Sequence, residues 1–263
     1  MKRLILALGA CLLMSAGAAS AVGSLADVTI FDRTSGRLLP VYMADGRHYV
    51  AGKPGDEYEI RIRNQTGADI LAVVSVDGVN AITGETASPA QSGYVLGVGR
   101  LLPIRGWRKD LTRTAAFYFT SLDDSYAART GRPDDVGVIG VALFKRKPQP
   151  PVYLEQRSKR EDAASGAARD AQSGRADSSP PPASAEAEMR SQQMPAEKGL
   201  GTGHGRNETS HARYTSFERE SEHPNEIVAI HYDSHANLVA RGIIREPARD
   251  PHPFPARFVP DPW

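Results

Sequence analysis

The feature that most constrains the fold is a block from Tyr58 to Phe144, in which short apolar runs alternate with glycine-centred turns. At its start, Tyr58, Ile60 and Ile62 alternate with charged residues, which is the period of two of a strand with one buried face. The gaps between the runs are too short for crossover helices, which excludes parallel βαβ units. The sequence therefore predicts an all-β fold, an antiparallel β-sandwich of jelly-roll or immunoglobulin-like type, over residues 22–144.

A hairpin and several further strands are expected inside this domain. Residues 70–76 are nearly all apolar, as in a central strand that is covered on both faces. Asp77-Gly78 follows and predicts a hairpin turn, because both central turn positions need positive φ, which Asp tolerates and Gly prefers. A helical turn is expected at 125–129, with Asp123 or Asp124 as its cap and Gly131 as its stop. Further strands are expected at 28–31, 38–43, 93–98, 101–108, 114–120 and 136–144.

The first 21 residues indicate export. Lys2 and Arg3 precede an apolar run at 4–14, and small residues at 19–21 form a cleavage site for a signal peptide that ends at Ala21. The apolar run is too short to span a bilayer stably, and no other segment approaches the ~20 apolar residues of a spanning helix. The sequence thus predicts a periplasmic protein without a transmembrane helix, with secretion as an alternative.

A lipid anchor is a second outcome of the same leader. The run from Leu8 to Cys11 resembles a bacterial lipobox, in which the cysteine becomes the lipidated first residue of an envelope lipoprotein. Cys11 is the only cysteine of the chain. Cleavage after Ala21 therefore leaves no disulfide, thiol nucleophile or thiolate metal site.

The charge balance argues against nucleic acid as a partner. Without Lys2 and Arg3, the 32 basic residues fall to 30 against 31 acidic ones, a net charge of −1. Non-specific binding to a polyanion needs a clustered basic surface, whereas acids and bases are interspersed along this chain. No nucleic-acid partner is expected.

Composition divides the rest of the chain. Residues 155–199 contain no Val, Ile, Leu, Phe, Tyr or Trp, so we expect a disordered linker, placed at 145–213. Residues 214–244 are expected to dock back onto the sandwich as an edge strand at 226–232 and a helix at 234–241, with Asp233 as its cap and Gly242 as its end. The last segment, 245–263, has six prolines and is expected to be an irregular tail, either packed on the domain or free.

Residues that could carry catalysis are weighed against ordinary structural roles. Paired-carboxylate catalysis or calcium binding would have to use five acidic residues in predicted loops, called the loop acids here: Glu85, Asp123, Asp124, Asp134 and Asp135. Their positions, however, also suit helix caps and turns. His231 and His235 have a metal-like spacing, but a strand and a helix are expected to separate them. His204 falls in a glycine run expected to be flexible. No catalytic residue, metal ligand or cofactor is therefore assigned.

A binding surface is predicted instead. Three aromatic residues and two arginines beside Gly131 form the candidate set, because aromatic faces suit glycans or peptides and guanidinium groups suit carboxylates: Tyr94, Trp107, Tyr126, Arg129 and Arg132. A tryptophan in a small sandwich also often fills the core, and the arginines also have Asp134 and Asp135 as potential ion-pair partners.

Several motifs together resemble an uncharacterised family of exported proteins of Gram-negative bacteria. The resemblance covers about 58–144 and is weaker at 214–244, and its motifs are SVDGVN (75–80), GETAS (84–88), SGY (92–94), GWRK (106–109) and SYAARTGRP (125–133). It implies a setting in the bacterial envelope and no reaction. The resulting hypothesis is a non-catalytic binding module for an envelope protein or glycan. The alternatives are a hydrolase or metal-assisted enzyme that uses the loop acids, and an assembly protein that acts through its tail.

Overall fold

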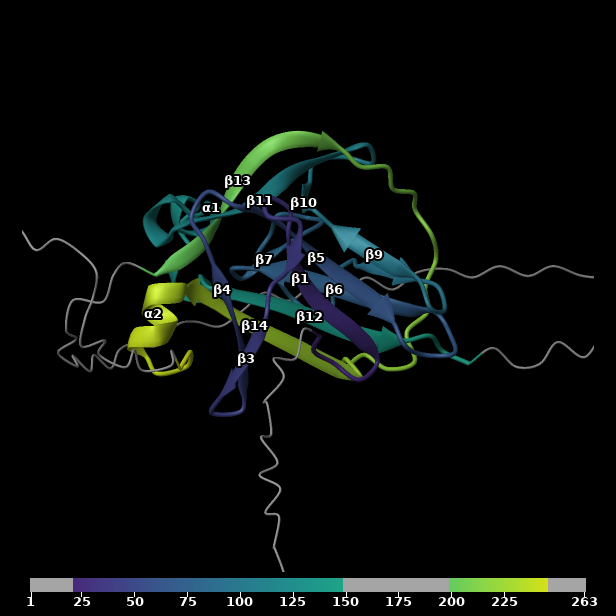
Figure 1. Ribbon diagram of the computed structural model, residues 1–263. Coiled ribbons are helices and arrows are strands. Elements are labelled where there is room, and N and C mark those ends of the chain that lie inside the picture. The colour runs from purple at the N-terminus through teal and green to yellow at the C-terminus, as the bar shows by residue number, and fades with distance from the viewer. Residues whose placement is uncertain (1–20, 149–198, 246–263) are drawn as a thin grey trace, which may run out of the picture. The chain divides into compact units, whose positions relative to one another are not determined.

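The computed structural model describes residues 21–148 and 199–245, which form two β-sheets packed face to face (Figure 1). The predicted all-β sandwich is thereby confirmed. The predicted signal peptide with Cys11, the linker from 149 to 198 and the tail from 246 onwards lie outside the described residues. Within the described ranges, no helix has the length and apolar character needed to cross a bilayer.

Each sheet has seven strands. Sheet 1 contains β1 (Ala26–Asp32), β2 (Arg37–Leu38), β5 (Glu57–Asn64), β9 (Leu101–Ile104), β10 (Gly106–Arg108), β11 (Arg113–Ser121) and β13 (Leu200–Thr209). Sheet 2 contains β3 (Val41–Ala44), β4 (Arg47–Gly52), β6 (Ile70–Val76), β7 (Val79–Asn80), β8 (Tyr94–Leu96), β12 (Val138–Lys145) and β14 (Glu226–Ser234). The helical elements are η1 (Leu122–Asp124), α1 (Tyr126–Arg129), η2 (Pro133–Asp135) and α2 (His235–Ala240).

The core lies between the inner faces of the two sheets. In sheet 1, Ile60 and Ile62 of β5 stand opposite Ile30 and Val28 of β1, and all four are fully buried. Alternate residues of β12 and β14 supply the facing side of the core from sheet 2. The apolar residues that recur at every second position of the sequence are therefore the ones whose side chains are buried.

The predicted hairpin turn is present between β6 and β7. Asp77 has φ +52° and Gly78 has φ +71°, as a type I′ turn requires. The helix caps differ from the prediction by one or two residues. Ser125 caps α1 by accepting a hydrogen bond from the Ala128 N–H (3.2 Å), because Asp123 and Asp124 belong to the preceding η1. Ser234 likewise caps α2, where Asp233 had been expected.

Two strands expected to be continuous are broken. The stretch 38–43 is divided into β2 and β3, which belong to different sheets; Pro40 lies between them and has no N–H for a ladder. The stretch 101–108 is divided at Arg105 into β9, which pairs with β5, and β10, which pairs with β11. At each break the chain stops pairing with one strand and begins to pair with another.

The prediction of a disordered linker up to 213 is wrong for β13. Leu200–Thr209 pairs antiparallel with β11 along its length, so the glycine run around His204 is a strand. The glycines are needed because neighbouring side chains lie against the backbone. A β-carbon on Gly203 would overlap the ring of Tyr118, and one on Gly201 would overlap Ser125.

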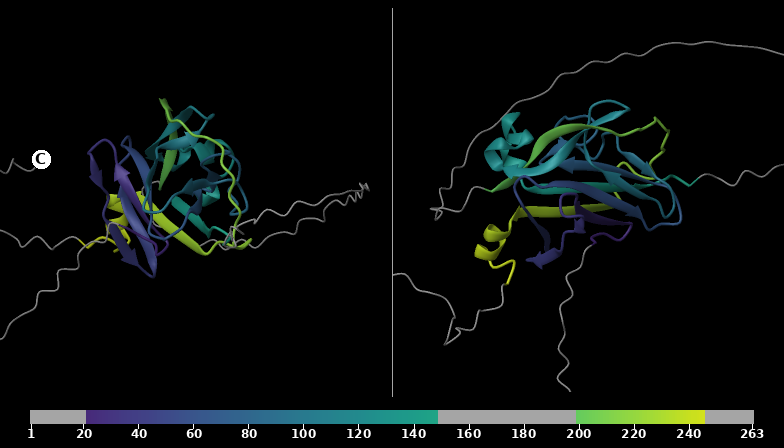
Figure 2. Two further views of the ribbon diagram at one scale, coloured as in Figure 1. Left: turned by 90° about the vertical axis from the view of Figure 1, so that its right-hand side faces the viewer. Right: turned by 45° about the horizontal axis from the view of Figure 1, so that its top comes forward.

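Residues 210–225 connect β13 of sheet 1 to β14 of sheet 2, and Figures 1 and 2 show them as the light-green chain that follows β13. Phe217 packs on a small apolar cluster of β6 and β12. The Arg219 guanidinium lies 4.1 Å from the centre of the Phe144 ring and donates to the Gln91 carbonyl at 2.7 Å. These contacts hold the connecting segment on the sheet.

β14 was expected at an edge, but it lies between β4 and β12. It pairs antiparallel with β12 and parallel with β4, which makes sheet 2 a mixed sheet. A parallel pair is possible here because the long stretch of chain between β4 and β14 leaves room for the connection that parallel strands require. The following helix, α2, packs Leu238 with Tyr49 and Ile244 on the outer side of β4.

Candidate functional site

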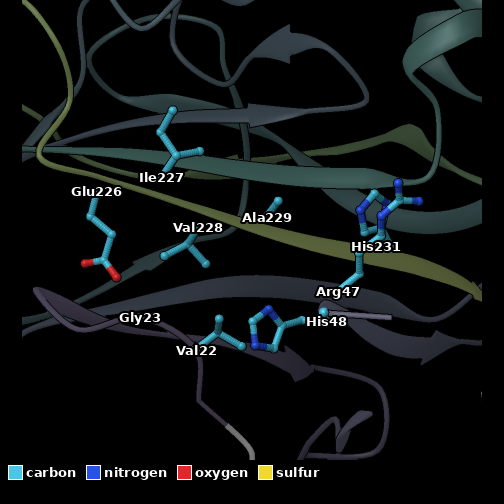
Figure 3. Close-up of a pocket in the computed structure, with 10 residues that line it drawn as sticks. Val22, Gly23, Arg47, His48, Glu226, Ile227, Val228, Ala229 and His231 are labelled. Atoms are coloured by element: carbon cyan, nitrogen blue, oxygen red, sulfur yellow. The ribbon is translucent and has the colours of Figure 1, made fainter. Parts of the chain in front are cut away.

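A groove of about 320 Å³ runs along the first half of β14 (Figure 3). Its walls are Val22 and Gly23, the segment 46–48 at the start of β4, and residues 226–229 with His231 of β14. In Figure 3, Glu226 marks one end, whereas Arg47, His48 and His231 mark the other. A volume of this size is at the lower end of the range for ligand sites.

The groove exists because β4 is shorter than β14 on their shared side. β4 pairs only with residues 230–234, so residues 226–229 have no strand beside them there within the described parts of the chain. Val228 is buried in the core, whereas Ile227 is 64% exposed. This stretch of sheet 2 therefore combines an open edge with an exposed apolar side chain.

The two ends of the groove differ in charge. At one end, the Glu226 carboxylate accepts hydrogen bonds from the Ser24 N–H (2.6 Å) and the Leu25 N–H (2.7 Å), which ties the start of the domain to β14. At the other end, Arg47 is exposed and has no ion-pair partner among the described residues. The positive end is thus free for a ligand, while the negative end already has a structural role.

A second hollow of about 180 Å³ continues from the positive end and shares Arg47 and His231 with the groove. The His231 ring lies 5.4 Å from that of Tyr49, and the Arg241 guanidinium lies 5.3 Å from the centre of the same tyrosine ring. Burial lowers the pKa of His231, and the nearby charges of Arg47 and Arg241 lower it further. The positive charge of this end at neutral pH therefore comes from the two arginines.

The predicted binding residues do not form one exposed surface. Trp107 is 3% exposed, and its ring meets Phe117 edge-on at 4.7 Å in the core. Tyr126 is half-buried and lies 4.9 Å from Trp107. The two rings are therefore in contact, but the Trp107 ring is part of the hydrophobic core. The prediction that Trp107 contributes to an exposed binding surface is corrected by this burial.

The remaining members of that set lie on the surrounding loops and strands. Tyr94 is half-buried and accepts a long hydrogen bond from Arg108 (3.4 Å). Arg129 is exposed at the end of α1, and Arg132 donates to the Gly84 carbonyl at 3.4 Å. A binding role for these residues stays a prediction.

The loop acids are divided among three places in the chain: Glu85 follows β7, Asp123 and Asp124 are in η1, and Asp134 and Asp135 are in η2. Glu85 accepts from Gln91 (3.2 Å) in its own loop, and Asp124 accepts from Ser121 (2.9 Å). His231 is in β14 and His235 in α2, on either side of the Ser234 cap. Within residues 21–148 and 199–245, no three His, Cys, Asp or Glu side chains lie together as a metal site would require.

A buried polar network joins the two sheets and was not foreseen. The Asp77 carboxylate accepts from the Tyr232 hydroxyl (2.5 Å), the Gly137 N–H (2.9 Å) and the Thr202 N–H (2.8 Å). The Thr202 hydroxyl lies 2.7 Å from the hydroxyls of both Tyr232 and Tyr58. Asp77 lies in the turn between β6 and β7 of sheet 2, and Tyr232 is in β14 of the same sheet, whereas Thr202 and Tyr58 belong to sheet 1. The network therefore joins the two sheets across the core.

Burial raises the pKa of Asp77 to about 6, although hydrogen bonds from Tyr232 and the backbone act in the opposite direction. The folded pKa is above the ordinary value of 3.8, so the folded state binds a proton that the unfolded state releases. Stability from this group is complete below the unfolded pKa and is lost as the pH rises through about 6.

We expect this group to make the free energy of unfolding fall by about 2 kcal/mol between roughly pH 4 and pH 7. His204 and His231, whose pKa values burial lowers, act in the opposite direction in this window. Urea denaturation of the wild type and of Asp77→Asn at each pH isolates the carboxyl group, because both proteins share the histidines. Equal pH dependence of the two proteins would contradict the assignment.

Comparisons with known protein families, with curated proteins and with solved structures give no match to this chain. Sequence reasoning had placed the strand at 226–232 but missed β4, so it had no means of locating the groove.

Proposed function

We propose that the protein is a non-catalytic binding module exported to the bacterial envelope, and that the groove along β14 is its ligand site. The observation that carries this proposal is the stretch Glu226–Ala229, which has an open sheet edge, an exposed apolar side chain and a free arginine beside it. Such edges bind extended polypeptides through main-chain hydrogen bonds. An envelope protein is therefore a better ligand class for this groove than a glycan.

The export signal at 1–21 and the resemblance to exported proteins support the location in the periplasm. An enzyme that uses the loop acids is the weaker alternative, because paired-carboxylate or metal chemistry needs these groups in one pocket. Glu85, Asp124 and Asp135 instead lie on three different loops and turns.

A photoreactive phenylalanine at position 229 tests the ligand site, since Ala229 is exposed in the groove. After irradiation in the native envelope, we expect a crosslinked species whose yield falls about tenfold when Arg47→Glu removes the positive charge. Position 63 provides the control, because Arg63 is exposed on β5 of sheet 1 and does not line the groove. The same species at both positions, or none at 229, would contradict the proposal.

A further inference from the structure

The backbone of β14 has hydrogen-bonding groups directed into the groove. In an antiparallel pair, backbone groups of alternate residues point to opposite sides of the strand. The Tyr232 N–H donates to the Gly137 carbonyl on the β12 side (2.9 Å), so the even-numbered residues of β14 are directed to β12. The odd-numbered residues Ile227 and Ala229 are therefore directed to the other side, where no described strand lies beside them. Their N–H groups are donors that face the groove.

The groove is closed at one end by β4. The register of the parallel pair places His48 opposite Ile230, so β4 stands beside β14 in line with the groove. Arg47, the first residue of β4, lines the groove at this end. A polypeptide that lies along residues 226–229 therefore cannot continue past Ala229 on the edge of β14. It either ends at β4 or turns away from the sheet.

The open stretch beside β14 is short and apolar. Residues 226–229 extend over about 13 Å, so only a few residues of an extended chain fit against them. Val22 and Val228, which are both buried, contribute apolar surface to the lining, and the exposed Ile227 side chain adds to it. The stretch therefore suits a short apolar segment that ends at β4.

The closed end of the groove offers positive charge without a counterion. Arg47 is exposed and has no ion-pair partner among the described residues. Arg241 of the adjoining hollow differs, because its guanidinium lies 3.6 Å from the Asp233 carboxylate. Asp45 is exposed in the turn before β4, but it does not line the groove. A carboxylate at this end would meet the Arg47 guanidinium and the open N–H groups of β14, whereas an ammonium group would be repelled.

We infer that the groove binds the C-terminal end of a partner polypeptide of the envelope, which lies parallel to β14 in line with β4 and places its terminal carboxylate at Arg47. The inference rests on the proposed role of the groove as a ligand site. It names the part of the partner that is recognised, which is a free carboxyl terminus preceded by apolar residues.

The direction of the bound chain follows from the charge. β14 runs from Glu226 towards the end of the groove at Arg47, so a chain whose last residue lies at Arg47 is parallel to β14. This is the pairing that β4 already makes with the same strand. A chain in the opposite direction would place its N-terminal ammonium group against Arg47, and an internal segment would have to turn away at β4. A guanidinium group, by contrast, binds a carboxylate through two parallel hydrogen bonds.

Two peptide libraries, each displayed on a carrier protein, test the recognition of a chain end. One library presents random octapeptides at a free C-terminus, and the other presents the same octapeptides followed by a constant Gly-Ser tail. We expect the full processed chain to enrich the first library about tenfold more than the second. A synthetic peptide of an enriched sequence should bind about tenfold more tightly with a terminal carboxylate than with a terminal carboxamide, as measured by isothermal titration calorimetry.

The variant Arg47→Gln identifies the group that binds the carboxylate. We expect this variant to bind the carboxylate peptide and the carboxamide peptide with equal affinity, because the guanidinium group is the source of the preference. The matched control is Arg63→Gln, an exposed arginine of β5 that does not line the groove, and it keeps the preference of the wild type. Equal enrichment of the two libraries, no enrichment of either, or an unchanged preference in Arg47→Gln would overturn the inference.

Mapping the crosslink at position 229 separates this inference from the proposed function. An adduct within the last few residues of a captured envelope protein supports both. An adduct at an internal segment supports the groove as a ligand site and overturns the recognition of a chain end. An adduct with the last residues of this same chain would overturn the assignment to a partner, and the absence of any adduct contradicts both proposals.

Discussion

Replacing Asp77 with alanine is expected to lower the free energy of unfolding by about 3–5 kcal/mol. The change leaves the Tyr232 hydroxyl and the N–H groups of Gly137 and Thr202 without acceptors in the core. It also places an alanine at φ +52°, where a β-carbon without a side-chain oxygen is strained. Urea denaturation near pH 7 measures the loss.

Another type I′ turn, between β3 and β4, provides a matched control. Asp45 and Gly46 have φ +50° and +71°, nearly the same pair of angles as Asp77 and Gly78. Asp45 is exposed, so Asp45→Ala measures the cost of the backbone alone, about 1 kcal/mol. The network has no stabilising role if Asp77→Ala costs no more than this control.

Asp77→Asn separates the charge from the hydrogen bonds. Asparagine tolerates positive φ, and its oxygen can still accept from Tyr232 and Gly137. Its amide group, however, would face the Thr202 N–H, donor against donor. We therefore expect a loss between those of Asp45→Ala and Asp77→Ala.

The comparison of sequence and structure at Asp77 shows which features are local. The turn was predictable, because positive φ at an Asp-Gly pair depends only on these two residues. The role of the carboxylate was not, because Thr202 and Tyr232 are 125 and 155 residues away in sequence. Strands such as β5 and β6 were likewise visible from local period and composition, whereas their neighbours were not.

The groove illustrates the same limit. It depends on the parallel pairing of β4 with β14, and specifically on β4 beginning beside Ile230 instead of beside Glu226. A single sequence contains no signal for this long-range register. Trp107 was recognised as either a surface or a core residue, and only the packing of Phe117 and Tyr126 around it decides for the core.

The glycines of β13 are the clearest case in which composition misled the prediction. Glycine weakens an isolated strand, so the run around Gly203 resembled a flexible linker. In the structure Gly203 stands directly opposite Tyr118 of β11. The tyrosine ring occupies the space that a side chain at position 203 would need. The absence of a side chain is thus what allows β13 to pair.

Gly203→Val is therefore expected to destabilise the fold by about 3 kcal/mol, because the valine side chain and the Tyr118 ring cannot occupy the same volume. Thermal and urea denaturation, followed by circular dichroism, measure the effect. Gly67→Val is the matched control, since Gly67 is exposed and a β-carbon there meets no atom within 4 Å. A cost at Gly203 no greater than at Gly67 would show that β13 does not pack as the structure has it.

The double variant Gly203→Val/Tyr118→Ala identifies the cause of the loss. Tyr118 is only half-buried, so its truncation alone should cost less than the valine substitution. If the clash with the ring is the cause, the double variant is more stable than Gly203→Val by at least about 1 kcal/mol, a non-additivity typical of residues in direct contact. Additive losses would instead indicate that glycine is required by the backbone of β13 itself. Gly203 has no positive φ, so the structure predicts the first result.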